Sequence, residues 1–180
     1  ARASLGQGRL TAASLIKLYI MGAVYSSYDN IAAANGQEQV DKLLNAMITV
    51  SDNDSANTLV GMLGNGDNAA GQEAVNTYCK NNGYTDTSMG RMLLEKASAN
   101  ENYTSARDCS VFLKNIYENK LEHSEDMLNL LKQQTRTEKI PKGIPSGVET
   151  ANKTGELDHV ENDAAIVFDG ENPYIICVMA

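Results

Sequence analysis

Hydrophobic residues recur at helical spacing over most of the first 135 residues. The stretch 12–25 is apolar on nearly every side, which predicts a helix in the middle of the protein with Thr11 as its cap. Amphipathic spacing predicts further helices, one capped by Thr104 or Ser105 and the last by Ser124. The predicted helices cover 12–25, 38–50, 55–63, 71–81, 105–120 and 124–134.

The pattern changes after two prolines and two glycines between positions 141 and 147. Strands are predicted at 148–153, 164–168 and 174–179, with a hairpin turn at 169–172. From 84 to 103 no period is convincing, and a loop of this length is usually functional or mobile. The expected fold class is therefore α/β (α+β), with a helical part at about 12–135 packed on an antiparallel sheet at about 148–180.

The composition argues against several classes of binding partner. The chain has 180 residues, 42% of them hydrophobic, so it can bury a sizeable core. A net charge of −8 without a basic patch argues against nucleic acid or an anionic membrane as partner. The longest apolar stretch, 15–25, is too short to span a bilayer.

Two isolated histidines give no pattern of metal ligands, so neither a metal nor a cofactor is expected. The cysteines Cys79, Cys109 and Cys177 are interpreted as small buried apolar residues.

The only Ser-x-x-Lys sequence in the chain, Ser14 to Lys17, lies in the first predicted helix. Residues three apart share a helix face, so the amine can approach the hydroxyl. A lysine in an apolar helix is desolvated, which lowers its pKa toward that of a neutral base able to activate serine. The ordinary alternative is that Lys17 extends its amine to solvent.

Two further motifs follow in order, Ser51-Asp52-Asn53 and Lys153-Thr154-Gly155. Each has a structural interpretation of its own. Asp52 is a typical helix cap at a turn between two helices, and Gly155 allows close approach of another backbone at a strand. Together the three motifs supply a nucleophile, a base, a further hydroxyl and a cation. This is the chemistry of an acyl-enzyme site.

The ordered trio resembles the serine β-lactamase and penicillin-binding protein superfamily, and is most similar to the class A β-lactamases. The segments 12–18, 47–57 and 103–108 resemble the family's sequences around its active site. The resemblance implies a single β-lactamase/transpeptidase-like domain over 1–180, located outside the cytoplasm. It also predicts that the domain is incomplete at both ends, lacking N-terminal strands and a C-terminal helix, which missing segments or a partner chain would supply.

The resemblance also implies a role for each motif residue. Ser14 would be acylated and Lys17 would be its base. Ser51 would relay a proton to the leaving nitrogen, and backbone N–H groups of Ser14 and Glu156 would form the oxyanion hole. The expected substrate-binding residues are Asn53, Lys153, Thr154 and Gly155.

The residue that would hydrolyse the acyl-enzyme is less clearly indicated by the sequence. Class A enzymes hydrolyse the acyl-enzyme with a loop glutamate, but alignment on Arg91 puts Leu93 at that place, with Glu95 and Glu101 nearby. Three functions therefore stay open. They are a β-lactamase that confers antibiotic resistance, a penicillin-binding D-alanyl-D-alanine peptidase that acylates and turns over slowly, and a catalytically idle relative that binds cell-wall peptides or a protein.

Overall fold

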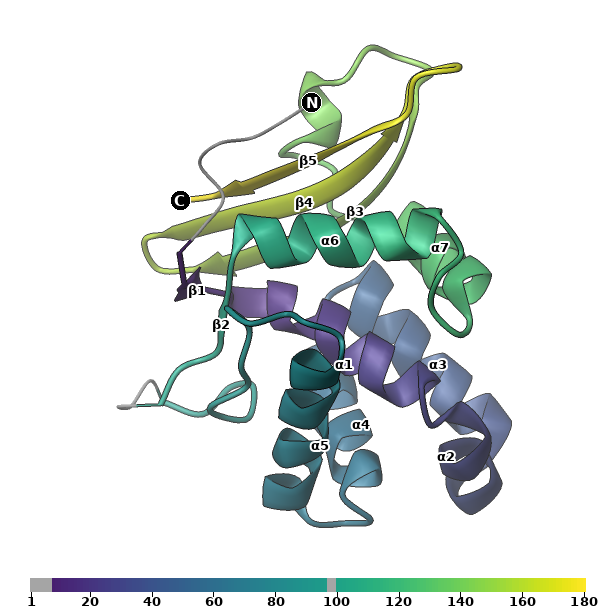
Figure 1. Ribbon diagram of the computed structural model, residues 1–180, viewed down its shortest axis with the longest axis vertical. Helices are drawn as coiled ribbons and strands as arrows, with labels where there is room; N and C mark the ends of the chain where they lie inside the picture. Colours follow the sequence, from purple (N-terminus) through teal and green to yellow (C-terminus); the bar gives the residue numbers. More distant parts are fainter. Residues whose placement is uncertain (1–7, 97–99) are drawn as a thin grey trace.

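A helical lobe and an antiparallel sheet form the computed structural model, which describes residues 8–96 and 100–180 (Figure 1). The helical elements are the 3₁₀ turn η1 (Ala13–Leu15), α1 (Ile16–Tyr25), α2 (Tyr28–Asn35), α3 (Gln37–Thr49), α4 (Asn53–Leu63), α5 (Asn68–Asn81), α6 (Ala106–Tyr117), α7 (Ser124–Lys132) and the 3₁₀ turn η2 (Pro141–Gly143). The strands are β1 (Leu10–Thr11), β2 (Tyr103–Thr104), β3 (Glu149–Leu157), β4 (Val160–Phe168) and β5 (Tyr174–Met179).

The sheet has the order β3-β4-β5 and is antiparallel throughout. Helices α6 and α7 pack against it and separate most of it from the other helices (Figure 1). Strand β3 is an edge strand, and η1 packs against it directly. This contact brings the N-terminal end of α1 to the sheet. The predicted fold class is confirmed.

Helix α1 is the centre of the core, as its all-round apolar sequence predicts. All ten of its residues are buried. Its Tyr19 ring packs against Tyr84 and Phe112, with centroids 5.3 Å apart in both pairs. Aromatic pairs at this spacing stabilise a core beyond their buried area. None of the described helices has the length and apolar character needed to cross a membrane.

Two expected helix starts are wrong. Thr11 pairs with Tyr103 in the short β1–β2 ladder, and η1 begins after Ala12 without a side-chain cap. Ser124 is the first residue of α7 rather than its cap, since its hydroxyl donates to the carbonyl of Leu121. Thr11 and Ser124, which were expected to cap helices, therefore make other hydrogen bonds.

Other elements differ in extent. Helix α2 was not predicted, because its residues are mostly small or polar and only Ile31 is buried. Strands β3 and β4 extend to a tight turn in which His159 has a φ of 64°. Cys177 is half-buried, not fully buried as expected. On β5, Tyr174 and Val178 are 37% and 50% exposed, and a chain that completes this edge stays a prediction.

Candidate active site

The three sequence motifs meet between the helical lobe and β3. Ser14 lies in η1, Lys17 in the first turn of α1, and Ser51 in the turn between α3 and α4. The Lys17 Nζ is 3.0 Å from the Ser14 Oγ and 3.1 Å from the Ser51 Oγ. Residues more than 30 positions apart therefore converge on one amine, and the idea that Lys17 extends to solvent is wrong.

Lys17 is arranged to act as a neutral base. Its Nζ donates to the Ser51 carbonyl at 2.7 Å and to the Asn53 Oδ1 at 2.6 Å, two groups that only accept. Burial lowers the pKa of Lys17 to about 7; Asp52 opposes this shift and Arg136 adds to it. A neutral amine has two N–H groups, which these acceptors occupy. Its lone pair is then free to take the Ser14 proton.

A second buried amine approaches from β3. The Lys153 Nζ donates to the Ser51 Oγ at 2.9 Å and to the Thr154 carbonyl at 2.7 Å. Burial lowers the pKa of Lys153 well below its usual value, and the nearby charges of Lys17 and Arg136 lower it further. The Ser51 hydroxyl thus lies between two amines, a position suited to passing a proton.

The backbone around both serines is strained. Ala13 and Ser51 have φ values of 47° and 62°, in the left-handed region that residues other than glycine rarely adopt. Hydrogen bonds hold the first of them in place. The Asn162 amide donates to the Ala12 carbonyl at 3.2 Å, and the Ala12 N–H donates to the Asn102 carbonyl at 2.8 Å. The fold thus fixes the turn that carries Ser14.

Gly155 lets β3 lie directly against that turn. A Cβ atom on Gly155 would lie 2.8 Å from the Ala12 carbonyl oxygen and 3.2 Å from the Ser14 nitrogen. The first distance is too short for a Cβ atom unless the backbone shifts, and the second is tighter than an ordinary contact. The close approach brings the Ser14 N–H near the strand that carries Glu156, as an oxyanion hole of these two amides requires. The oxyanion hole itself stays a prediction.

The substitution Gly155→Ala should therefore separate β3 from η1. Overpacking of this kind costs about 1–3 kcal/mol, and a displacement near 1 Å in an active site can cost about 10²-fold in rate. We expect a lower melting temperature and a much slower reaction of Ser14 with penicillin. Gly143→Ala is the matched control, because a Cβ there meets nothing within 4 Å. Equal acylation rates for the two variants would contradict the proposed packing.

Side-chain amides, rather than a regular element, order the loop at 84–103. Each amide replaces backbone pairing at a different point of the loop. The Asn76 side chain bonds both backbone groups of Met89, Asn57 does the same for Leu93, and Asn102 Oδ1 accepts from the N–H groups of Gly90 and Arg91. This explains why the segment shows no hydrophobic period and is nevertheless ordered where it is described.

Neither candidate glutamate joins the cluster around Ser14 in the described part of the loop. The Glu101 carboxylate accepts from Arg91 at 2.8 and 3.0 Å. The Glu95 carboxylate accepts from the Met92 N–H at 3.2 Å. Both groups bond within their own loop, while Leu93 is held by Asn57 and is 8% exposed. A catalytic role for either glutamate stays a prediction.

Two cations near the site were not singled out from the sequence. Arg136 lies 3.5 Å and Lys139 3.1 Å from the Glu156 carboxylate. With Lys17 and Lys153 they form a locally basic site in an acidic protein. Lys17, Lys153 and the pair Arg136 and Lys139 come from three separate segments, so the four cations do not form one run in the sequence. Their only sequence signal is the cluster of positive charges between 136 and 142.

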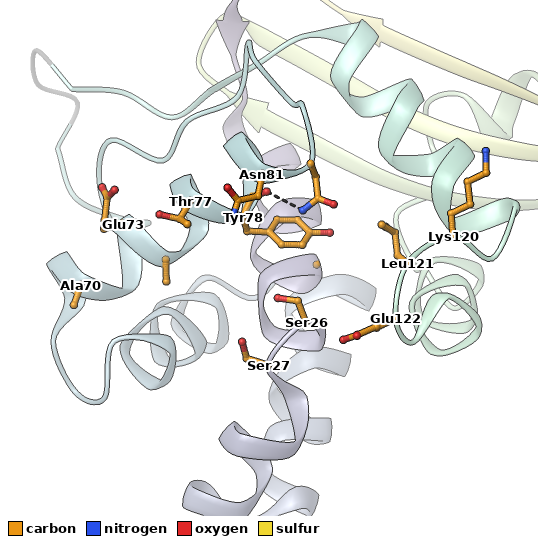
Figure 2. Close-up of a pocket in the computed structure, with 13 residues that line it drawn as sticks. Ser26, Ser27, Ala70, Glu73, Thr77, Tyr78, Asn81, Lys120, Leu121 and Glu122 are labelled. Atoms are coloured by element: carbon orange, nitrogen blue, oxygen red, sulfur yellow. Dashed lines mark hydrogen bonds between the residues drawn. The ribbon is translucent and has the colours of Figure 1, made fainter.

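A separate cavity of about 680 Å³ lies between the end of α1, α5 and the loop before α7, and contains none of the motif residues. Figure 2 shows the Tyr78 ring above Ser26, with its hydroxyl end toward Leu121, and the Asn82 amide donates to the Tyr78 carbonyl at 2.9 Å. The cavity and the motif cluster are therefore distinct.

Comparison with known proteins agrees with the motif geometry. A model of the β-lactamase enzyme family matches residues 32–180, a range that includes the second and third motifs but not Ser14. The fold is similar to that of a β-lactamase from Sphaerobacter thermophilus, with a TM-score of 0.78, 23% identity, and coverage of 95% of this chain and 74% of that one. No curated protein matches the chain.

A penicillin-binding protein, PBP-A, has the same fold. Its TM-score is 0.81 with 23% identity, over 97% of this chain and 73% of PBP-A. A leucine-to-glutamate variant of PBP-A, solved as an acyl-enzyme complex with penicillin G, has a TM-score of 0.80 and 21% identity, over 97% and 73% of the two chains. At these identities the structures establish the fold alone.

Proposed function

Because this chain belongs to the β-lactamase enzyme family, we propose that it forms an acyl-enzyme at Ser14 with β-lactams or D-alanyl cell-wall peptides, outside the cytoplasm. Both substrates combine a carboxylate with a reactive amide. The observation that carries the proposal is the 3.0 Å contact between the Ser14 hydroxyl and the buried Lys17 amine, whose pKa is about 7. A base with this pKa is half neutral near physiological pH.

In the acylation step, Lys17 takes the Ser14 proton while the Oγ bonds to the substrate carbonyl carbon. The N–H groups of Ser14 and Glu156 stabilise the oxyanion. When the amide bond breaks, the Ser51 hydroxyl gives a proton to the leaving nitrogen and recovers one from the neighbouring amines, 2.9 and 3.1 Å away. The transfers from Ser14 to Lys17 and from the amines to Ser51 thus run along hydrogen bonds already present in the protein.

The local positive charge favours a substrate that carries a carboxylate. Thr154 and Lys153 lie on the edge strand β3, and we expect both to bind the substrate carboxylate. Arg136 is 49% exposed and adds a guanidinium that can pair with an anion. Asn53, whose Oδ1 is bonded to Lys17, keeps its NH₂ group for the substrate amide.

Between the hydrolytic and the slow-turnover alternatives, the loop favours slow turnover. Leu93 offers no base, and Glu95 and Glu101 bond within the loop. Water must be activated to attack the ester carbonyl of the acyl-enzyme, and general-base assistance is worth about 10²–10⁴ in rate. We therefore propose a long-lived acyl-enzyme, the behaviour of a penicillin-binding protein.

Mass spectrometry after incubation with penicillin G tests this proposal. We expect one stable adduct with the mass of the intact antibiotic, located by proteolysis in the peptide that contains Ser14. Turnover of a chromogenic cephalosporin, measured in parallel, should be slow. Absence of an adduct, together with absence of turnover, would refute acylation, and rapid turnover would refute the slow-turnover proposal.

The substitution Leu93→Glu should shorten the life of that adduct. The new carboxylate would stand at the place where class A enzymes carry their water-activating base, with its backbone still held by Asn57. We expect at least about tenfold faster loss of the adduct, within the range of general-base catalysis. Leu94→Glu is the matched control, because Leu94 is 68% exposed. An unchanged adduct lifetime in Leu93→Glu would argue against this alignment of the loop.

A further inference from the structure

A second cavity lies at the other end of α1 from the catalytic cluster. It has a volume of about 560 Å³ and is bounded by the end of α1, α2, α3 and the start of α7. Tyr25 lies eight residues after Lys17 on α1, roughly 12 Å along the helix axis. A ligand in this cavity would therefore not contact Ser14.

Three aromatic rings form one wall of the cavity. The Tyr25 ring lies 5.5 Å from the Tyr28 ring and 5.1 Å from the His123 ring, and Tyr28 and His123 are 5.0 Å apart, all between centroids. His123 adopts a left-handed backbone conformation with a φ of 59°, which brings its ring against the tyrosines at the start of α7. The faces of aromatic rings attract cations.

Two carboxylates flank the rings. The Tyr28 hydroxyl donates to Asp41, and the His123 Nδ1 is 2.9 Å from the Asp126 carboxylate. Burial raises the pKa of Tyr25, and the negative charges of Asp126 and Asp41 raise it further, so both carboxylates lie close to this phenol. Lys42 is the one cation in the lining and is exposed, so the lining is net negative with His123 neutral.

The Tyr25 side chain supplies an unused polar group. The residue is only 6% exposed and lines the cavity, and its hydroxyl makes no hydrogen bond to another group among residues 8–96 and 100–180. The hydroxyl is therefore available to a ligand in the cavity. Its position beside two carboxylates leaves room for a ligand that satisfies all three groups.

We propose that this cavity binds the ammonium group of a small organic cation. The rings of Tyr25, Tyr28 and His123 would contact its alkyl and cationic surface, and Asp41 and Asp126 would balance its charge. A neutral saccharide could also contact aromatic rings and polar groups. It would gain nothing from the two carboxylates, so the cation is the better fit.

Choline and its neutral isostere 3,3-dimethyl-1-butanol distinguish these possibilities. We expect saturable choline binding to the full chain, followed by NMR of the tyrosine and histidine rings, with shifts confined to Tyr25, Tyr28 and His123. The isostere should bind at least about tenfold more weakly, because it lacks the charge. Choline affinity should fall as salt rises.

Variants locate the site. Asp126→Asn and Asp41→Asn should each weaken choline binding several-fold, and together at least about tenfold. Asp54→Asn, at an exposed carboxylate on α4, removes the same charge elsewhere and should leave binding unchanged. Thermal unfolding of each variant reports whether it is folded, and Tyr25→Phe keeps the ring while removing the hydroxyl. Equal binding of the isostere, saturable binding of N-acetylglucosamine without choline binding, or absence of choline binding to the wild type would each overturn the proposal.

Discussion

Replacing Ser14 with alanine should abolish the covalent penicillin adduct. In the proposed mechanism this hydroxyl bonds to the substrate carbonyl. Its Oγ lies 3.0 Å from the Lys17 Nζ, and the Ser14 nitrogen lies beside Gly155. Lys17 would keep its bonds to Ser51 and Asn53, so the variant should fold normally. Intact-protein mass spectrometry at saturating penicillin G should show the unmodified mass alone.

Ser51→Ala is the informative control for this experiment. Its hydroxyl also lies 3.1 Å from Lys17 and is the alternative nucleophile by geometry. If Ser51 acts only as a relay, its loss slows adduct formation without preventing it, and the adduct stays on Ser14. An adduct retained by Ser14→Ala and lost in Ser51→Ala would reverse the two assignments.

The substitution Lys17→Met should slow acylation by about 10²–10⁴, the range expected when a general base is lost. Methionine keeps the apolar stem in the buried helix but cannot accept a proton. Lys17→Arg should be similarly slow, since a guanidinium stays protonated. Lys80→Met, at an exposed position on α5, is the matched control. Quenched mass spectrometry would compare the rates of adduct formation in the wild type and the three variants and so test whether Lys17 is the base.

The pH profile separates a catalytic Lys17 from a structural one. Because the pKa of Lys17 is about 7, its neutral form grows as pH rises through 7, and the acylation rate should rise with it and level off near pH 8. This dependence should disappear in Lys17→Met and persist in Lys80→Met. A wild-type rate that is flat between pH 6 and 8 would contradict a base with this pKa.

Local patterns in the sequence predicted the parts of the site that depend on local geometry. The spacing of Ser14 and Lys17 follows from one helical turn, and Asp52 caps α4 through a 2.7 Å bond from the Ser55 N–H. The apolar sequence of α1 predicted the central helix, and the change of pattern after position 147 predicted the sheet. The family resemblance is confirmed by the match over residues 32–180.

Contacts between distant segments could not be predicted in this way. Asn162 lies between Glu161 and Asp163 in the polar first part of β4, and nothing near it in the sequence indicates that it holds Ala12. Arg136 acts on Lys17 and Lys153 only because the chain folds back on itself. Such roles depend on three-dimensional proximity, for which hydrophobic periodicity carries no signal.

The amide-held loop has an evolutionary consequence. Asn57, Asn76 and Asn102 hold the loop through its backbone, so the bonds that hold Leu93 do not depend on the identity of its side chain. A single substitution there can introduce or remove a water-activating group while the scaffold and the nucleophile stay intact. Under the proposed acylation of Ser14, selection by an antibiotic would therefore act on release of the acyl group without disturbing its capture.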